Sequence, residues 1–303
     1  MAVPARTLAF ALLSVALLSC SAQGSGDPQD DPDTGGDEVG GDSTPIVDSP
    51  TSDAPTLDAP SDVGGDTGGG VDTGSEASPV DTGPGTPLDP PAGATSGGKG
   101  GAAASGTAKT TPTGVTYRLI APGSGAAQPL MIVFSGTEGG AAMTSNLQSV
   151  APSTGTSAVI FAVLDGTVYY GKGAAGADVL DDVRKSYDVD NDRTYLLGES
   201  AGTTAALQLG FDLRQSWFAA YWANDVNARA VPSKNAATLG FAPFGNAGPG
   251  GDFADANAIV AAMKSAGYRV PPPAPYDGAG AGTHGSPNQF VAAVSWFPGK
   301  SRK

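Results

Sequence analysis

One serine of the chain stands in a motif that is typical of a catalytic nucleophile. The motif Gly-x-Ser-x-Gly occurs once, at residues 198–202, with Ser200 at its centre. An apolar stretch at 194–197 that favours a strand precedes it, and small residues that favour a helix follow it. A serine on the tight turn between strand and helix exposes its hydroxyl beside free N–H groups that stabilise negative charge. Ser200 is therefore the predicted nucleophile; the alternative is a tight strand–helix turn without chemistry.

A serine hydroxyl needs a general base, and the chain contains a single histidine. His284 lies in a Gly-rich loop on the C-terminal side of the serine. A histidine near neutral pH is the side chain that most often takes the proton of a nucleophilic hydroxyl. A lone histidine is usually structural, but here it is the one histidine that could act, so we predict His284 as the base.

Two aspartates could orient the imidazole. Asp225 directly follows a predicted strand at 219–223, and Asp252 lies after the Gly-rich stretch 245–251. We predict Asp225 as the acid and keep Asp252 as the alternative. Each also has a purely structural interpretation, because Asp225 could be a turn residue and Asp252 stands where a helix N-cap is expected.

Two backbone N–H groups are expected to stabilise the oxyanion of the reaction. One belongs to Ala201, directly after the serine, and the other to the Gly-rich loop that follows a predicted strand at 129–134. Thr137 is the predicted donor of that loop, with Glu138 as the alternative. No spacing of ligand residues in the sequence is typical of a metal site, so we expect neither a metal nor a cofactor.

Short apolar runs that alternate with helical patterns must position these residues. Strands are predicted at 115–120, 129–134, 158–164, 193–197, 219–223 and 237–241, with a helical pattern between most of them. Continuous apolar runs are typical of parallel strands that are covered on both faces. The pattern predicts an α/β protein with a mostly parallel sheet and helices on both of its faces.

The composition divides the 303 residues into three parts. The chain holds 45 Gly, 25 Pro and a net charge of -14, and 16 of its 30 acidic residues lie between Asp27 and Asp89. We predict a signal peptide at 1–19, a disordered acidic Gly/Pro/Asp-rich linker at 20–113, and a hydrolase domain at 114–303. Without the linker the chain is near neutral, so we expect no nucleic-acid partner.

The N-terminus resembles a bacterial lipoprotein signal. Arg6 precedes an apolar run that ends at Leu18 and is followed by Cys20, the single cysteine of the chain. This resemblance implies lipidation of Cys20; the alternative is an ordinary signal peptide that is cleaved near Ala22. A lipid on Cys20 would anchor the protein to a membrane without spanning it, in the cell envelope, either in the periplasm or at the surface.

Residues 114–297 resemble α/β-hydrolase esterases of the polyhydroxyalkanoate depolymerase and feruloyl esterase group. The similarity is carried by 114–122, by 129–140, by Gly282-Thr283-His284 and, most specifically, by 181–202. It implies the α/β-hydrolase fold and hydrolysis of a small or polymeric ester through a Ser-His-Asp triad and an acyl-enzyme. Where related enzymes carry Gly-x-x-Asp, this chain has Gly245-Asn246-Ala247-Gly248. An inactive surface binding lipoprotein and a peptidase or amidase of the same fold therefore remain as alternatives.

Overall fold

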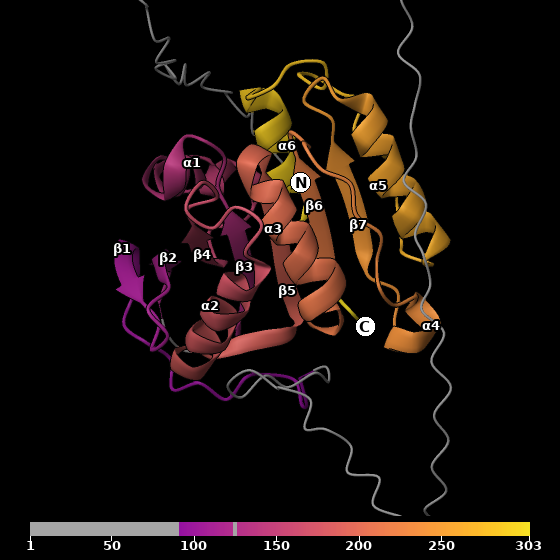
Figure 1. Cartoon of the computed structure of the whole chain (residues 1–303). Helices are drawn as coiled ribbons and strands as arrows, with labels where there is room; N and C mark the ends of the chain where they lie inside the picture. Colours follow the sequence, from indigo (N-terminus) through magenta and orange to yellow (C-terminus); the bar gives the residue numbers. More distant parts are fainter. Residues whose placement is uncertain (1–90, 124–125) are drawn as a thin grey trace, which may run out of the picture. The chain divides into compact units, whose positions relative to one another are not determined.

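A mixed sheet of seven strands forms the centre of the computed structural model, which describes residues 91–123 and 126–303. Its order is β1-β2-β4-β3-β5-β6-β7 (Figure 1). Strands β3 to β7 run parallel to one another, whereas β2 pairs antiparallel with both β1 and β4. The strands are β1 Ala104–Thr110, β2 Thr116–Ala121, β3 Gln128–Phe134, β4 Ile160–Leu164, β5 Val189–Glu199, β6 Ala220–Asn224 and β7 Phe244–Gly248.

Helices cover both faces of this sheet (Figure 1). On one face α1 and α6 pack against Met131, Val133 and Leu197, and on the other face α2, α3 and α5 pack against Ile132 and Leu196. The alternation of side chains along β3 and β5 thus divides the core into two layers, as continuous apolar strands require. The helices are α1 Gly139–Thr154, α2 Gly173–Ser186, α3 Thr203–Gln208, α4 Ala236–Leu239, α5 Phe253–Ser265 and α6 Pro287–Trp296.

The topology is that of the α/β-hydrolase fold. The parallel strands β3 to β7, the antiparallel β2 and the Gly-x-Ser-x-Gly turn directly after β5 occur together in this arrangement. The fold class predicted from the sequence is confirmed.

The ordered domain begins earlier than the predicted boundary at residue 114. Strand β1 lies within the predicted linker and pairs with β2 over Ala104 to Thr110, and Thr95 forms an isolated bridge with Asp190. The prediction of a disordered linker is therefore wrong for residues 91–113. Small residues such as those of β1 carry no apolar signal, because the strand is an exposed edge. The predicted signal peptide, Cys20 and the acidic part of the linker lie outside the described residues.

One predicted strand is also corrected. Residues 237–241 form most of the short helix α4 and its left-handed end at Gly240, and the next strand is β7, Phe244–Gly248. The side chain of Asn235 accepts a hydrogen bond from the N–H of Thr238 and thereby begins the helix. Within the described residues, no helix is long and apolar enough to cross a membrane.

Candidate active site

Ser200 stands on a strained turn at the carboxyl end of β5. Its φ angle is 45°, in the left-handed region, and it begins a helical turn that leads into α3. Both glycines of the motif are required by close approaches. A Cβ on Gly198 would lie 2.6 Å from Cβ of Ala206, and one on Gly202 would lie 2.5 Å from the carbonyl oxygen of Phe134. The backbone therefore holds Ser200 between β3 and α3, in the geometry of a nucleophile turn.

The structure brings Ser200 and His284 into hydrogen-bond contact. Ser200 Oγ lies 2.9 Å from His284 Nε2, across 84 residues of sequence. The Ser200 residue is 9% exposed, whereas the His284 side chain is 59% exposed. A nitrogen at this distance can accept the hydroxyl proton, so the pair has the geometry of a nucleophile and its base.

Asp225 faces the other ring nitrogen of His284. Its Oδ2 lies 4.0 Å from His284 Nδ1, which is longer than a hydrogen bond. Catalytic contacts are often long without substrate and tighten in the complex, so this distance is compatible with an orienting role. The Asp225 residue is fully buried, at 0% exposure.

Asp225 is fixed by donors from the segment around α6. The N–H of Gly285 donates to Oδ2, and Nε2 of Gln289 donates to Oδ1 over 2.5 Å. Gln289 is itself buried, and its Oε1 accepts the N–H of Gly250 over 3.2 Å. Sequence reasoning missed Gln289, since a buried glutamine in a helix has no motif; its single signal was its place five residues after His284.

Asp252 is used differently from Asp225. It is the N-cap of α5, where its Oδ1 accepts a hydrogen bond from the N–H of Asp255 over 3.0 Å. The residue is exposed, and its contact is local. Of the two aspartates considered from the sequence, the structure places Asp225 beside His284 and gives Asp252 a helix-capping role.

The loop after β3 lies directly against Ser200. A Cβ on Gly136 would lie 3.2 Å from Cβ of Ser200. The N–H of Thr137 has no acceptor within the described chain, and Ala201 follows Ser200 in the first helical turn, where N–H groups lack intrahelical partners. Thr137 and Ala201 thus lie on the two segments that flank Ser200, as expected for the predicted oxyanion site.

Glu138 folds back onto the same loop. Its Oε1 accepts the N–H of Gly136 over 3.0 Å, and Oε2 lies 2.5 Å from the position of a Cβ on that glycine. Although the residue as a whole is exposed, its carboxyl is turned inward, and this burial raises its pKa above the ordinary value. The charges of Asp165 and Asp225 also raise this pKa. The sequence analysis gives the N–H of Glu138 as the alternative donor to the oxyanion. The side chain of Glu138, however, places an acidic group near Ser200.

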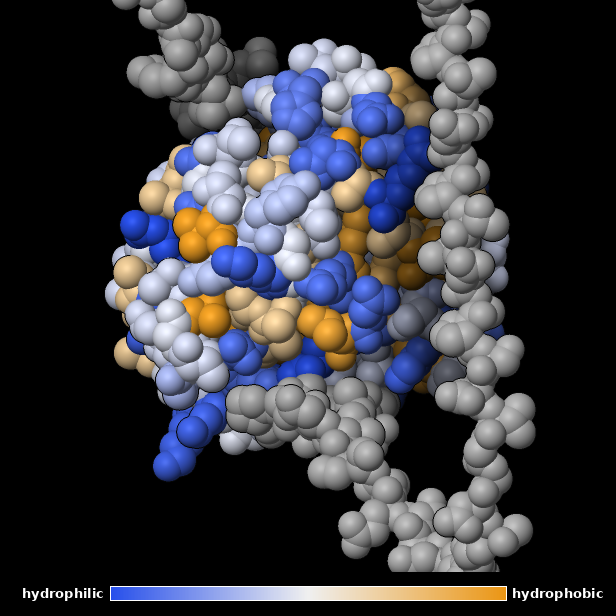
Figure 2. Space-filling view, viewed as in Figure 1, coloured by the Kyte–Doolittle hydropathy of each residue, from blue (hydrophilic) through white to orange (hydrophobic). Residues whose placement is uncertain are grey.

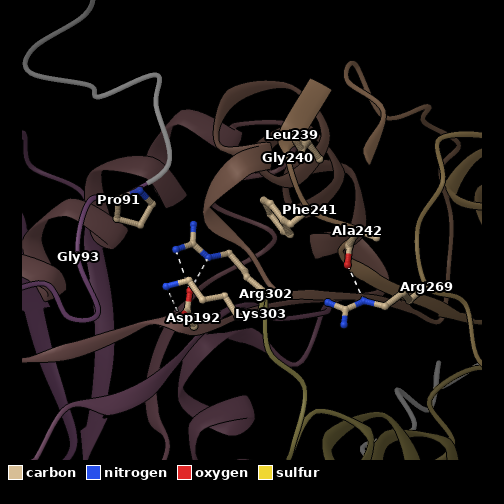
Figure 3. Close-up of a pocket in the computed structure, with 10 residues that line it drawn as sticks. All are labelled: Pro91, Gly93, Asp192, Leu239, Gly240, Phe241, Ala242, Arg269, Arg302 and Lys303. Atoms are coloured by element: carbon tan, nitrogen blue, oxygen red, sulfur yellow. Dashed lines mark hydrogen bonds and ion pairs between the residues drawn. The ribbon is translucent and has the colours of Figure 1, made fainter. Parts of the chain in front are cut away.

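A pocket lies away from Ser200. Its volume is about 600 Å³, and it lies near Asp192, at the beginning of β5 (Figure 3). Ser200 follows the end of that strand. The side chain of Arg302 donates to Asp192, and Arg269 donates to the carbonyl of Ala242. Neither Ser200 nor His284 lines this cavity. Among the residues described, no group of three or more His, Cys, Asp or Glu side chains could hold a metal ion.

The surface shows small apolar areas. In the view of Figure 2, hydrophobic residues form separate small areas between hydrophilic ones. In the described part of the chain, the large apolar side chains that are exposed are Val168, Tyr170, Val231, Phe253 and Val291. Single exposed apolar residues of this kind are ordinary on a protein surface.

Comparisons with known proteins find structural similarity without sequence similarity. No protein-family model and no curated protein matches the chain. The chain is similar to a thermostable esterase (14% identity, 65% of this chain and 62% of that chain, TM-score 0.46). It is also similar to the poly(3-hydroxybutyrate) depolymerase LpqC from Bordetella parapertussis (17%, 62% and 85%, 0.45). A third is P91, a dienelactone hydrolase-like promiscuous phosphotriesterase from metagenomic libraries (13%, 69% and 100%, 0.44). The chain spans less than two thirds of the thermostable esterase, at 62%.

Proposed function

We propose that this protein is a serine hydrolase that cleaves carboxylic esters through an acyl-enzyme. The observation that carries this proposal is the contact of 2.9 Å between Ser200 Oγ and His284 Nε2. The serine stands at φ 45° directly after a parallel strand, and the chain holds no second histidine. A structural serine has no need of a strained turn that points its hydroxyl at the sole imidazole.

In the proposed reaction, Ser200 Oγ attacks the ester carbonyl while His284 Nε2 takes the hydroxyl proton. The N–H groups of Ala201 and Thr137 hold the oxyanion, and Asp225 orients the imidazole and stabilises its charge. His284 then gives the proton to the leaving alcohol. The same nitrogen next removes a proton from water, which attacks the acyl-enzyme. His284 returns that proton to Ser200 Oγ as the C–O bond breaks and the acid leaves.

The substrate we propose is a small or polymeric ester. An imidazole with 59% of its surface exposed lies in an open site, which can admit an ester group of a large molecule. Two of the structurally similar proteins are described as an esterase and a poly(3-hydroxybutyrate) depolymerase, and this supports the choice of ester over amide. No step of the proposed reaction needs a metal or a cofactor.

Labelling with a fluorophosphonate probe tests the nucleophile. We expect a covalent adduct on Ser200 in the folded full-length protein, with none on Ser200→Ala and a much slower reaction for His284→Ala. Turnover of p-nitrophenyl esters and peptide anilides should be compared in parallel. Absence of an adduct on folded protein would favour the inactive binding lipoprotein, and faster cleavage of anilides would favour a peptidase or amidase.

We also propose that the protein is lipidated on Cys20 and held in the cell envelope, in the periplasm or at the surface. The support is the apolar run that ends at Leu18, two residues before the single cysteine. Metabolic labelling with a fatty acid in a bacterial host should mark the wild-type protein and not Cys20→Ala. Equal labelling of both proteins, or of neither, would contradict this assignment.

A further inference from the structure

We propose that Glu199 is a positioning residue that shares one proton with Asp225 and thereby holds the Asp225 carboxylate in place for His284. The inference concerns the residue directly before the nucleophile and rests on the proposed function. It predicts that one of the two carboxyls stays protonated at neutral pH.

The strands place Glu199 and Asp225 side by side. Glu199 is the last residue of β5 and pairs in register with Asn224, the last residue of β6, so Asp225 follows on the neighbouring strand. Nδ2 of Asn224 donates to Oε2 of Glu199 over 2.8 Å. Oδ1 of Asn224 in turn accepts the indole N–H of Trp222 over 2.9 Å. The orientation of the Asn224 amide is thus set, and it fixes the Glu199 carboxyl from one side.

Among residues 91–123 and 126–303, the Glu199 carboxyl has no cationic partner. The residue is 7% exposed, and the groups that act on its charge are Asp225, Glu138 and the Asn224 amide. His284 lies beyond Asp225, at 4.0 Å from its Oδ2. Two adjacent buried carboxylates without a cation cannot both ionise, because each charge loses its water and repels the other.

Glu199 is the member of the pair that keeps the proton. Burial raises the pKa of Glu199 well above its ordinary value, and the negative charge of Asp225 raises it further. The register of β5 and β6 brings the two carboxyls together, and two carboxyls can be joined by a hydrogen bond only with a proton between them. Asp225 accepts hydrogen bonds from Gln289 and from the N–H of Gly285, so both of its oxygens already have donors.

The shared proton has a consequence for the geometry of the site. Asp225 stands at φ 49°, in a strained conformation, and donors hold its two oxygens from the side of α6. A protonated Glu199 adds a donor from β5, on the side of Ser200. An ionised Glu199 would instead repel Asp225 and add a second negative charge behind His284.

Infrared difference spectroscopy of the full-length protein tests the proton directly, without any need for activity. At neutral pH we expect a carbonyl band of a protonated carboxyl that is lost in Glu199→Gln. Asp181→Asn is a matched control, since Asp181 is partly buried but accepts from Arg214 over 2.8 Å and should contribute no such band. A wild-type protein without the band, or a band that survives in Glu199→Gln, would overturn the proposal even if the esterase function is correct.

The pH profile of ester hydrolysis separates positioning from mere packing. Glu199→Gln keeps the size and a donor, so we expect its acidic limb of kcat/KM at the same pH as in the wild type. Glu199→Ala should lose roughly ten- to hundredfold in kcat, comparable to the loss of groups that orient a metal-bound histidine. If Glu199 were ionised, Glu199→Gln would move the acidic limb toward lower pH, which contradicts the proposal. If fluorophosphonate does not label Ser200 in the folded wild-type protein, the proposed function is contradicted instead.

Discussion

Ser200 and Asp225 share an unusual backbone conformation. Their φ angles are 45° and 49°. Within the described chain, they are the two non-glycine residues with a positive φ angle. Such a conformation costs about 1–3 kcal/mol at each position and persists where the surroundings determine it. The close packing of Gly202 on β3 holds the turn of Ser200 in this conformation. The hydrogen-bond donors around Asp225 hold that residue. Strain at both residues fits a site that is built for positioning.

At Glu138 we expect removal of a charge to raise activity. Its carboxyl accepts the N–H of Gly136 beside Ser200, where an ionised group would repel the developing oxyanion. Glu138→Gln keeps the acceptor and loses the charge. We expect kcat to rise roughly tenfold, for about 1.4 kcal/mol of transition-state stabilisation, above the pH at which Glu138 ionises.

The pH dependence supplies the control for this variant. Since burial raises the pKa of Glu138, wild type and Glu138→Gln should converge at low pH, where the wild-type carboxyl is protonated. Steady-state ester hydrolysis measured across pH checks both limits. A loss of activity at every pH would show instead that the carboxyl itself takes part in the reaction.

The sequence pointed to the residues that we propose as the triad but not to the residues that hold them. Ser200 has a motif, His284 is the sole histidine, and Asp225 follows an apolar run, so each has a signal along the chain. The contact of Gln289 with Asp225 spans 64 residues of sequence. The contact of Glu199 with Asn224 spans 25 residues and depends on strand register. Such contacts carry no local pattern, because a polar side chain is buried through the fold rather than through its neighbours in sequence.

At the scale of elements, strand β7 shows why one part of the sheet could not be predicted. Its five residues, Phe-Gly-Asn-Ala-Gly, contain no β-branched side chain. A Cβ on Gly245 would lie 2.2 Å from the sulfur of Met263, and one on Gly248 would lie 2.3 Å from Oδ1 of Asn224. The strand is therefore made of small residues because α5 and the polar network behind Asp225 approach it closely. The apolar residues 237–241 resembled a strand more strongly but form a helix.

Helix α5 provides a test that separates the two aspartates. Asp252→Ala removes the N-cap of α5, so we expect a loss of about 1 kcal/mol of unfolding free energy and no loss of kcat. Asp225→Asn should lower kcat by orders of magnitude, because the imidazole loses the carboxylate that orients it. Urea denaturation and ester hydrolysis on both variants check this. Inactivation by Asp252→Ala in a folded protein would reverse the assignment.

The loop after β4 is a second element whose packing supports the nucleophile turn. A Cβ on Gly166 would lie 1.8 Å from the carbonyl oxygen of Ser135 and 2.8 Å from Cα of Gly202. Gly166→Ala must therefore separate this loop from the turn, and we expect a loss of about 1–3 kcal/mol in unfolding free energy with slower fluorophosphonate labelling. Gly282→Ala is the control, since nothing lies within 4 Å of its Cβ position. Equal behaviour of the two variants would refute the packing argument.

At the scale of the whole molecule, the sequence predicted the layers of the described domain but placed the beginning of that domain too late, at residue 114. Alternating apolar runs predicted the layers of the sheet and the helices, because burial on both faces leaves a continuous apolar signal. The segment 91–113 has no such signal: it lies at the sheet edge and is held mainly by backbone contacts. Hydrogen bonds of that kind do not depend on residue type, so the Gly-, Ala- and Thr-rich composition of this segment predicts a linker.

Truncation of the chain tests whether residues 91–113 belong to the domain. The N–H of Ser96 donates to the carbonyl of Val189 over 2.8 Å, and the buried Asn191 side chain donates to the carbonyl of Ala92 over 3.1 Å. Tyr187 Oη donates to the carbonyl of Ala102 over 3.1 Å. Removing these partners leaves the Asn191 amide unsatisfied, at a cost of about 1–3 kcal/mol, and exposes the edge of β2.

Deletion of residues 1–113 should therefore lower the midpoint of urea unfolding and promote self-association, whereas deletion of residues 1–90 should leave the midpoint of the full-length protein unchanged. Both truncated proteins should still label Ser200 while folded, because the lost contacts lie at the beginning of β5 and Ser200 follows its end. Urea unfolding and sedimentation on the two deletions make the measurement. If the two truncated proteins unfold at the same urea concentration, the domain begins at residue 114 and residues 91–113 do not stabilise it.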